Sequence, residues 1–370
     1  MFEKYGKSLA CPKCLSEDLH RHGYTKKVVC LNNLRRTRFF CRKCKITFSD
    51  NFFQMNYRFR HKDQALSSKI FMALIGGMPN RRIAKMLDIS EHCVRIRLNR
   101  LAQSGLVFQN ELVQKYGIKE AICYDGLENF SFSQFNPNNI NQAIGRDSLF
   151  IYDFNYANLN RKGRTSIWQK QRLLEIEAEH GRYNPRAIRI TSTRIFKRLL
   201  KLNKKERLEL LTDEHFQYKR SIQKDLKGSP IDHVTVSSKA TRNYQNILFS
   251  VNHADMMIRH RMKSFTRETI AFAKTAGVMC QKYALFMLHK NFMEPQFTKK
   301  HHRRVDADTR SPAEKARLVD RMLGYRDIFG YRAVKNSEIK RLSSDWKCVF
   351  NATIPKDQTR QHKFIRQLVS

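Results

Sequence analysis

The chain has 370 residues, in which 71 lysines and arginines outnumber 33 aspartates and glutamates and give a formal net charge of +38. Hydrophobic residues make up 41% of the chain, so the composition excludes a disordered basic tail and allows two or three packed domains. Such a charge attracts polyanions, of which nucleic acid is the natural one. The longest apolar runs, at 70–75 and 283–288, are too short to span a bilayer, and the N-terminus carries no apolar signal core. Because the cysteines occur in tight pairs that suit a reducing compartment, we expect a cytoplasmic protein with no membrane partner.

Residues 1–50 are basic and rich in cysteine, and they contain two C-x-x-C pairs. Each pair offers two thiolates to one side of a tetrahedral ion, and two pairs complete the four-cysteine site that Zn²⁺ prefers. We predict a zinc ribbon whose structural metal supplies the folding energy of a segment too small for its own core. His20, His22 and Cys30 are alternative ligands, and free thiols or a redox pair are the alternative to a metal. The four predicted ligands are Cys11, Cys14, Cys41 and Cys44.

Residues 62–105 are predicted to form a helix-turn-helix DNA-binding domain. Apolar residues recur with helical spacing between 83 and 98, and Ala84 is small where two helices would cross. Asp88 occupies the turn, where glycine is usual, and Ser90 is the expected N-cap of the second helix. The alternative is an ordinary helical hairpin with arginines on its solvated face. In the DNA-binding interpretation, the second helix presents four residues outward to double-stranded DNA: His92, Arg95, Arg97 and Arg100.

Residues 118–295 are predicted to form an α/β domain, with a mixed sheet flanked by helices. Two of its expected strands end in an acid, Asp125 and Asp213. Converging carboxylates on such a sheet can hold a pair of Mg²⁺ or Mn²⁺ ions, which activate the attacking oxygen and steady the leaving oxygen of a phosphoryl displacement. The expected strands are at 121–125, 131–135, 148–152, 207–213 and 231–236, and a long helix is expected from about 252 to 274.

In this order the segments resemble bacterial insertion-sequence transposases of the DDE class. Besides the ribbon, the helix-turn-helix and Asp125, the resemblance rests on residues 212–215 and 252–274, and it covers roughly residues 10–330. It implies a ribonuclease H-like catalytic domain in which three acids hold two Mg²⁺ ions for DNA strand cleavage and transfer. Asp125 would be the first acid and Asp213 the second. Taken singly, Asp125 could instead end its strand in a turn, and Asp213 could be an acid at a helix N-terminus.

The third acid is left open. Family members carry a carboxylate on the long helix, often a glutamate, but Asn252 occupies that position here. Asp255 lies one turn later on roughly the same face and is the first candidate, although with Asn252 as N-cap it could be a first-turn acid stabilised by the helix dipole. Glu268 is the second candidate and lies well around the helix from Asp255. Arg259 and Lys274 are expected to contact substrate phosphates.

Two basic segments complete the predicted organisation. Residues 155–205 are expected to be a helical insertion that faces DNA, with dimer contact as the alternative, and residues 296–370 a basic C-terminal tail. The first function that follows is a nucleoid-associated transposase that binds terminal inverted repeats, as a homo-oligomer on DNA, and cuts and joins them. The second is a catalytically inactive zinc-ribbon and helix-turn-helix regulator derived from such an enzyme. A nuclease of the same fold is the third.

Overall fold

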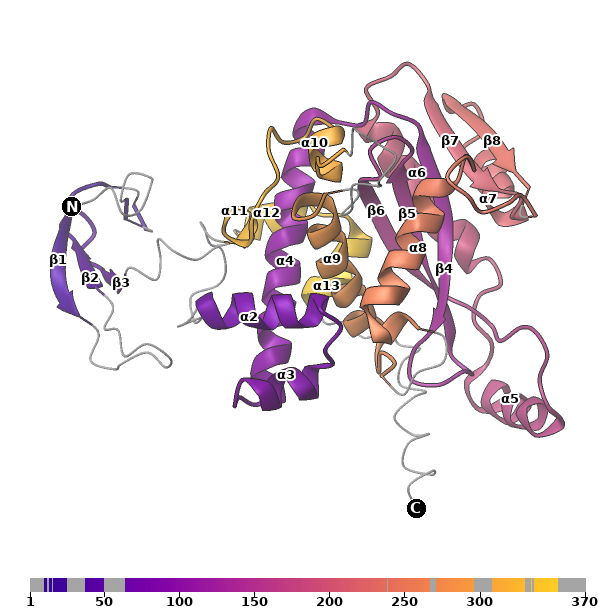
Figure 1. Ribbon diagram of the computed structural model, residues 1–370, viewed down its shortest axis with the longest axis horizontal. Coiled ribbons are helices and arrows are strands. Elements are labelled where there is room, and N and C mark those ends of the chain that lie inside the picture. Colours follow the sequence, from indigo (N-terminus) through magenta and orange to yellow (C-terminus); the bar gives the residue numbers. More distant parts are fainter. Residues whose placement is uncertain are drawn as a thin grey trace.

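The computed structural model describes residues 10–11, 13–14, 16–24, 37–49, 64–237, 239–266, 271–295, 308–329, 334 and 336–351. These residues form a three-stranded sheet near the N-terminus and a larger α/β unit built on five strands (Figure 1). The predicted class, a mixed sheet with flanking helices, is therefore confirmed. Among the described helices, none combines the length and the apolar character that a membrane crossing requires.

The N-terminal sheet is antiparallel and consists of β1 (Leu19–Tyr24), β2 (Thr37–Cys41) and β3 (Thr47–Ser49). Phe39 and Phe48 lie opposite each other on β2 and β3, with ring centroids 5.9 Å apart. Together with Cys11 and Cys41 they make up the buried cluster of this module, as far as its described residues show. Such a small cluster cannot offset the entropy of folding without a further stabilising contact.

The larger sheet has the strand order β6-β5-β4-β7-β8. Strands β4 (Ile122–Phe130), β5 (Pro137–Gly145) and β6 (Ile151–Asn158) form an antiparallel meander. Strands β7 (Leu208–Asp213) and β8 (Ile231–Val236) add to β4 in parallel. Because β4 pairs with β7 only from Ile122 to Tyr124 but with β5 along its whole length, its second half extends past the carboxyl end of β7.

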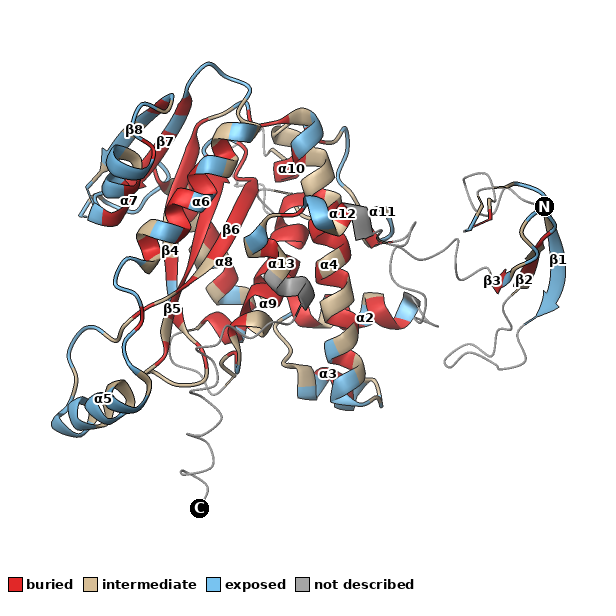
Figure 2. Cartoon of the chain, turned by 180° about the vertical axis from the view of Figure 1, so that it is seen from behind, coloured by how far each residue is buried: buried red, intermediate tan, exposed pale blue. Residues whose placement is uncertain are grey.

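Helices cover both faces of this sheet. Adjacent residues of a strand point to opposite faces, and in β4 Tyr124 packs edge-on against Phe196 of α6 (Ala187–Leu202) and Tyr218 of α7 (Phe216–Arg220). On the other face, the thiol of Cys123 donates to the carbonyl of Ile247 just before α8 (Phe249–Arg261). Figure 1 shows α8 in front of the sheet, and Figure 2, seen from behind, shows α6 there instead.

The helices predicted as a separate DNA-binding domain share the core of the α/β unit. Helix α4 (Glu91–Tyr116) runs through the expected boundary at residue 105 and packs along α9 (Ala276–Phe292). Gly105 permits this contact, because a Cβ at that position would lie 2.0 Å from Leu288 Cδ1. Buried residues concentrate along these two helices and the sheet (Figure 2), so residues 64–116 belong to one hydrophobic core with the sheet.

The sequence predicted wrong positions for two strands and a wrong end for the long helix. Residues 131–135 form the turn between β4 and β5, and the strand itself lies at 137–145; the expected 148–152 strand is β6, shifted toward the C-terminus. β5 escaped prediction because its buried positions include Asn138, Asn139, Asn141 and Gln142, amides that normally indicate loops. The expected helix from 252 to 274 ends at Arg261, because the next residue is extended and the chain turns inward at buried Phe265.

The predicted insertion at 155–205 divides into two different parts. Helix α5 (Ile167–His180) has no buried residue, and Figure 2 shows it standing away from the body. Helix α6 instead belongs to the core, because Ile188, Ile195 and Phe196 recur on one helical face and are buried against the sheet. The expectation that the whole segment faces DNA is wrong for α6.

The described part of the C-terminal segment also belongs to the fold rather than to a free tail. Trp346 is buried, and its indole N–H donates to the carbonyl of Phe154 in β6 at 3.1 Å. Asp345 beside it pairs with Arg194 and Arg198 of α6. The helices of this segment are α10 (Pro312–Lys315), α11 (Tyr325–Phe329), α12 (Asn336–Arg341) and α13 (Ser344–Asn351).

Candidate functional site

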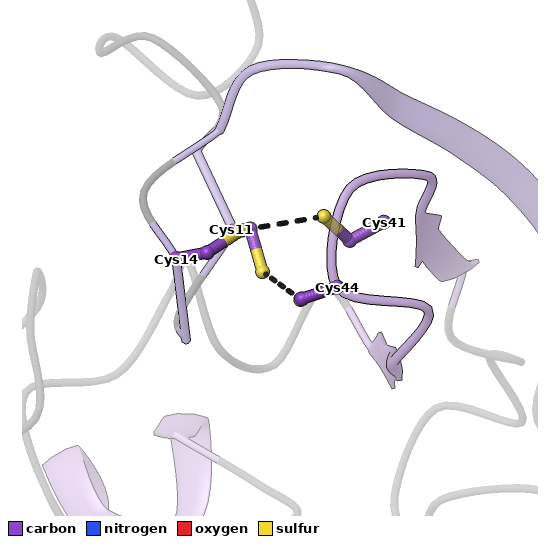
Figure 3. Close-up of side chains that lie close together, drawn as sticks. All are labelled: Cys11, Cys14, Cys41 and Cys44. Atoms are coloured by element: carbon purple, nitrogen blue, oxygen red, sulfur yellow. Dashed lines mark hydrogen bonds between the residues drawn. The ribbon is translucent and has the colours of Figure 1, made fainter.

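The four predicted zinc ligands come together at one end of the N-terminal sheet (Figure 3). The Sγ atoms of Cys11 and Cys44 are 3.4 Å apart, those of Cys14 and Cys41 are 3.6 Å apart, and all four ligand atoms lie within 4.8 Å of one another. Four sulfurs around a tetrahedral zinc at about 2.3 Å would be about 3.8 Å apart, so the four cysteines can bind a structural zinc.

The alternative zinc ligands do not join this cluster. His20 and His22 lie on β1 with exposed side chains, and Cys30 lies outside the described residues. The metal-binding set predicted from the two C-x-x-C pairs is therefore the one that the structure gathers.

The segment predicted as a helix-turn-helix forms two helices joined by a tight turn. Helix α3 (Asn80–Met86) is followed by a turn in which the N–H of Ile89 donates to the carbonyl of Ala84. Asp88, within this turn, has a φ of 50°. Ser90 caps α4, because its hydroxyl accepts from the N–H of Cys93 at 3.1 Å. Helix α2 (Gln64–Ile75) precedes this pair. Asp88 thus has the left-handed backbone conformation for which glycine is the usual residue in such a turn.

This turn gives a small stability prediction. Asp88→Gly is expected to raise the free energy of unfolding by about 0.5–1 kcal/mol, because glycine adopts a positive φ without the clash of a Cβ. Urea denaturation of the variant beside the wild type measures the difference. Asp88→Ala is the control and should lower stability. A glycine variant less stable than the wild type would contradict the expectation.

One of the four expected DNA-contacting residues of α4 points inward. Arg97 is 8% exposed, and its guanidinium donates to Ser67 Oγ at 2.7 Å and to Cys93 Sγ at 3.5 Å. The expectation that Arg97 faces DNA is wrong, because it lies one turn from buried Val94 and beside Leu98 on the face that packs against α2. The other three remain candidates, with His92 and Arg95 exposed and Arg100 half-buried.

The three predicted acids, Asp125, Asp213 and Asp255, line one cavity of about 720 Å³. They come from three different elements: β4, β7 and α8. The cavity lies where β4 extends past the end of β7, so that side chains from both faces of the sheet reach it.

Asp125 does not end its strand as expected. It is followed in β4 by Gly126, which continues the pairing with β5, so the alternative of a turn at Asp125 and Gly126 is wrong. Asp125 is nevertheless the first residue of β4 beyond the pairing with β7. Its Oδ1 accepts from the N–H of Gly126 at 2.7 Å and from the hydroxyl of Tyr218 at 3.5 Å.

Asp213 is the last residue of β7, as predicted. Its Oδ1 accepts from the N–H of His215 at 3.0 Å, and His215 is the N-cap of α7. Asp213 therefore precedes the helix, and the alternative that it is a helix N-terminal acid is wrong. His215 also lines the cavity, and burial lowers its pKa below the ordinary value.

Asp255 lies in the interior of α8, which begins at Phe249 rather than near Asn252. It is therefore past the first turn, and the alternative that it is a first-turn acid is wrong. Its Oδ1 accepts from the side-chain amide of Gln142, whose Oε1 in turn accepts from the hydroxyl of Tyr283 at 2.5 Å. Glu268, the other candidate for the third acid, lies outside the described residues.

The electrostatics of the cavity centre on Asp125. Burial raises its pKa from 3.8 to about 7, the negative charges of Asp213 and Asp255 contribute in the same direction, and the N–H of Gly126 and Arg242 oppose them. Within the described residues, the four cysteines are the only group of three or more His, Cys, Asp or Glu residues close enough together to hold one metal ion. The three carboxylates thus face one cavity without closing into a tight cluster, which mutual repulsion favours.

Two cationic side chains line the same cavity, Arg242 and Arg259. The guanidinium of Arg259 donates to the carbonyls of Phe265 and Glu128 at 3.4 and 3.2 Å, which fixes its position beside the cavity. Lys274, expected on the same helix as Arg259, lies instead in the loop before α9 and is exposed.

The sequence interpretation missed Gln142, Asn139 and Arg242. Gln142 lies directly opposite Asp125 on β5 and holds Asp255, while Asn139 and Arg242 line the cavity. One feature of the sequence could have indicated these residues. Side-chain amides are concentrated between residues 136 and 142 around the apolar Ile140, and such a pattern is unusual for a loop. The cavity offers carboxylate and amide oxygens, the ligands that hard divalent cations prefer, and its lining also includes His215 and His253.

The chain matches no protein-family model, and no curated protein matches it significantly.

Proposed function

We propose that the protein is a metal-dependent DNA enzyme, a transposase of the DDE class that cleaves and transfers DNA strands. The observation that carries this proposal is the convergence of Asp125, Asp213 and Asp255 from three elements on one cavity. A ribonuclease H-like fold is part of the proposal, and the five-stranded mixed sheet with helices on both faces is compatible with it.

In this proposal the three carboxylates bind two Mg²⁺ or Mn²⁺ ions. When bound, such ions activate the attacking oxygen and stabilise the leaving oxygen of an in-line phosphoryl displacement. Asp125 would lose its proton on becoming a ligand, and the hydrogen bond from Gln142 would hold Asp255 in place at the cavity. Arg242 and Arg259 at the rim bind the phosphates that flank the scissile bond.

The DNA-binding role is assigned to the N-terminal part of the chain. Zinc held by the four cysteines would keep the basic ribbon folded against phosphates, and His92, Arg95 and Arg100 on α4 would contact terminal inverted repeats. Assembly of a homo-oligomer on two transposon ends belongs to the same proposal. The net charge of +38 supports binding to nucleic acid but carries no sequence information.

The decisive experiment is nicking of supercoiled plasmid with and without Mg²⁺ or Mn²⁺, by wild type and by Asp213→Ala. We expect metal-dependent nicking that the variant loses by at least about a thousandfold, because it removes a metal ligand, while its affinity for DNA is retained. Glu214→Gln is the matched control: it changes an exposed carboxylate next to Asp213 that is not among the described residues lining the cavity.

The alternative function makes the opposite prediction. Tight binding to the DNA that flanks the gene, with no nicking by wild type in either metal, would contradict the enzyme and support the inactive DNA-binding regulator. Equal nicking by the wild type and Asp213→Ala would locate the chemistry elsewhere.

A further inference from the structure

A line of buried hydrogen bonds connects helix α13 to the cavity. The side-chain amide of Asn155 donates to the carbonyl of Thr191 at 2.8 Å and to the carboxylate of Asp345 at 3.2 Å. The amide of Asn141 donates to Asn155 Oδ1, and the amide of Asn139 donates to Asn141 Oδ1, both at 2.8 Å. This asparagine relay, Asn139–Asn141–Asn155, crosses strands β5 and β6 beneath α6.

The direction of the relay is fixed at its far end. The carboxylate of Asp345, paired with Arg194 and Arg198, and a backbone carbonyl can only accept hydrogen bonds. Asn155 must therefore turn its NH₂ toward them and its oxygen toward Asn141. The hydroxyl of Thr191 donates to the carbonyl of Ala187 at 2.8 Å, so it accepts from Asn141 at 2.9 Å and enforces the same direction.

At the near end, this direction leaves the Oδ1 of Asn139 buried beside the cavity without a hydrogen-bond partner among the described residues. Asn139 lines the cavity and is 2% exposed. The amide lies against the residue after Asp125: a Cβ on Gly126 would be 2.1 Å from its Nδ2 and 2.5 Å from its Oδ1. A buried acceptor without a partner destabilises the folded state, so an oriented one beside a cavity of carboxylates calls for a ligand.

We propose that Asn139 supplies a neutral oxygen ligand to the divalent cation of this cavity, held in orientation by the asparagine relay. The inference rests on the proposed function, because it assumes the cation that the three carboxylates bind. Asparagine carbonyl oxygens are ordinary ligands of hard divalent cations. A neutral ligand adds an oxygen without adding to the repulsion between the carboxylates.

The relay also gives helix α13 a positioning role. Asp345 is far along the chain from the cavity and touches Asn155 rather than any of the three acids. Asp345 fixes the orientation of the three asparagine amides, so that Asn139 presents its oxygen rather than its NH₂ group to the cation. Asp345 is thus a positioning residue for the metal site.

The test is Mn²⁺ binding to zinc-loaded full-length protein, followed by electron paramagnetic resonance of the free ion. Asn139→Leu should weaken Mn²⁺ binding about tenfold or more, as the loss of a ligand or its support does. Asn138→Leu is the matched control, because Asn138 is the neighbouring buried asparagine on β5 and is not among the described residues of the cavity. Its Mn²⁺ affinity should equal that of the wild type.

A second variant guards against loss of folding in Asn139→Leu. Asp345→Asn keeps Asn139 but places an amide that can donate at the far end of the relay, and it should weaken Mn²⁺ binding about threefold. If Asn139→Leu folds and binds Mn²⁺ as tightly as the wild type, the inference is overturned. If Asn139→Leu does not fold, wild-type Mn²⁺ affinity in Asp345→Asn overturns it. If the wild type binds no more Mn²⁺ than Asp213→Ala, the proposed function itself fails.

Discussion

Removing the metal from the four-cysteine cluster is expected to unfold the N-terminal ribbon while the α/β unit stays folded. The ribbon's buried cluster of Cys11, Phe39, Cys41 and Phe48 includes two of the ligands themselves, so little apolar burial is left to hold β1–β3 together. Structural zinc contributes about 10–16 kcal/mol of apparent binding free energy in small modules. The amide resonances of β1–β3 should therefore collapse to unfolded positions on chelation and return with added zinc.

Substitutions separate the metal from the rest of the chain. Cys41→Ser removes a buried ligand and should reproduce the effect of chelation, with zinc content falling to near zero. Cys93→Ser is the control, since Cys93 lies on α4 outside the cluster, and it should keep one zinc per chain. The thermal transition of the α/β unit should be the same in both variants. A folded ribbon in metal-free protein would contradict the prediction.

The parts of the structure that the sequence predicts well are those with a local cause. Two C-x-x-C pairs bring their own thiolates together, and Ser90 caps the helix that follows it. Strand β7 carries buried leucines at 208, 210 and 211 and ends in Asp213. In each case the residues that decide the structure are close in sequence, so spacing alone carries the information.

The parts that the sequence misplaces depend on contacts between distant segments. Strand β5 contains amides because they bond to each other, to α6 and to Asp255, and those partners lie far away in sequence. Arg97 points inward because Ser67 of α2 accepts its guanidinium. Helix propensity continues past Arg261, but the chain bends where Phe265 enters the core. Each of these three features is explained only by contacts that form in the tertiary structure.

The candidate site falls between these cases. The sequence identified Asp125 and Asp213 from strand-end position, although Asp125 lies within a longer strand. Asp255 was one of two candidates for a third acid, and the structure places it at the cavity. The supporting amides, Gln142 and Asn139, could not be found without β5 in its place, because only strand pairing brings them opposite Asp125 and Glu128.

The stability of the metal-free protein is expected to fall as pH rises because of Asp125. Its pKa is raised on folding from 3.8 to about 7, so between these values the folded state binds more protons than the unfolded state. Stability is therefore greatest below the unfolded pKa, is lost as pH rises toward the folded pKa, and stays reduced above it. The full loss is on the order of 4 kcal/mol.

Asp125→Asn removes this titration. The variant should be as stable as the wild type near about pH 4 and more stable by on the order of 4 kcal/mol near about pH 8, as measured by urea denaturation with chelator present. Glu214→Gln, an exposed carboxylate beside Asp213, should follow the wild type at both pH values. Because cation binding favours the ionised carboxylate, saturating Mg²⁺ should restore stability to the wild type near pH 8 and leave Asp125→Asn unchanged. Parallel pH profiles for Asp125→Asn and wild type would show that the cavity does not hold Asp125 protonated.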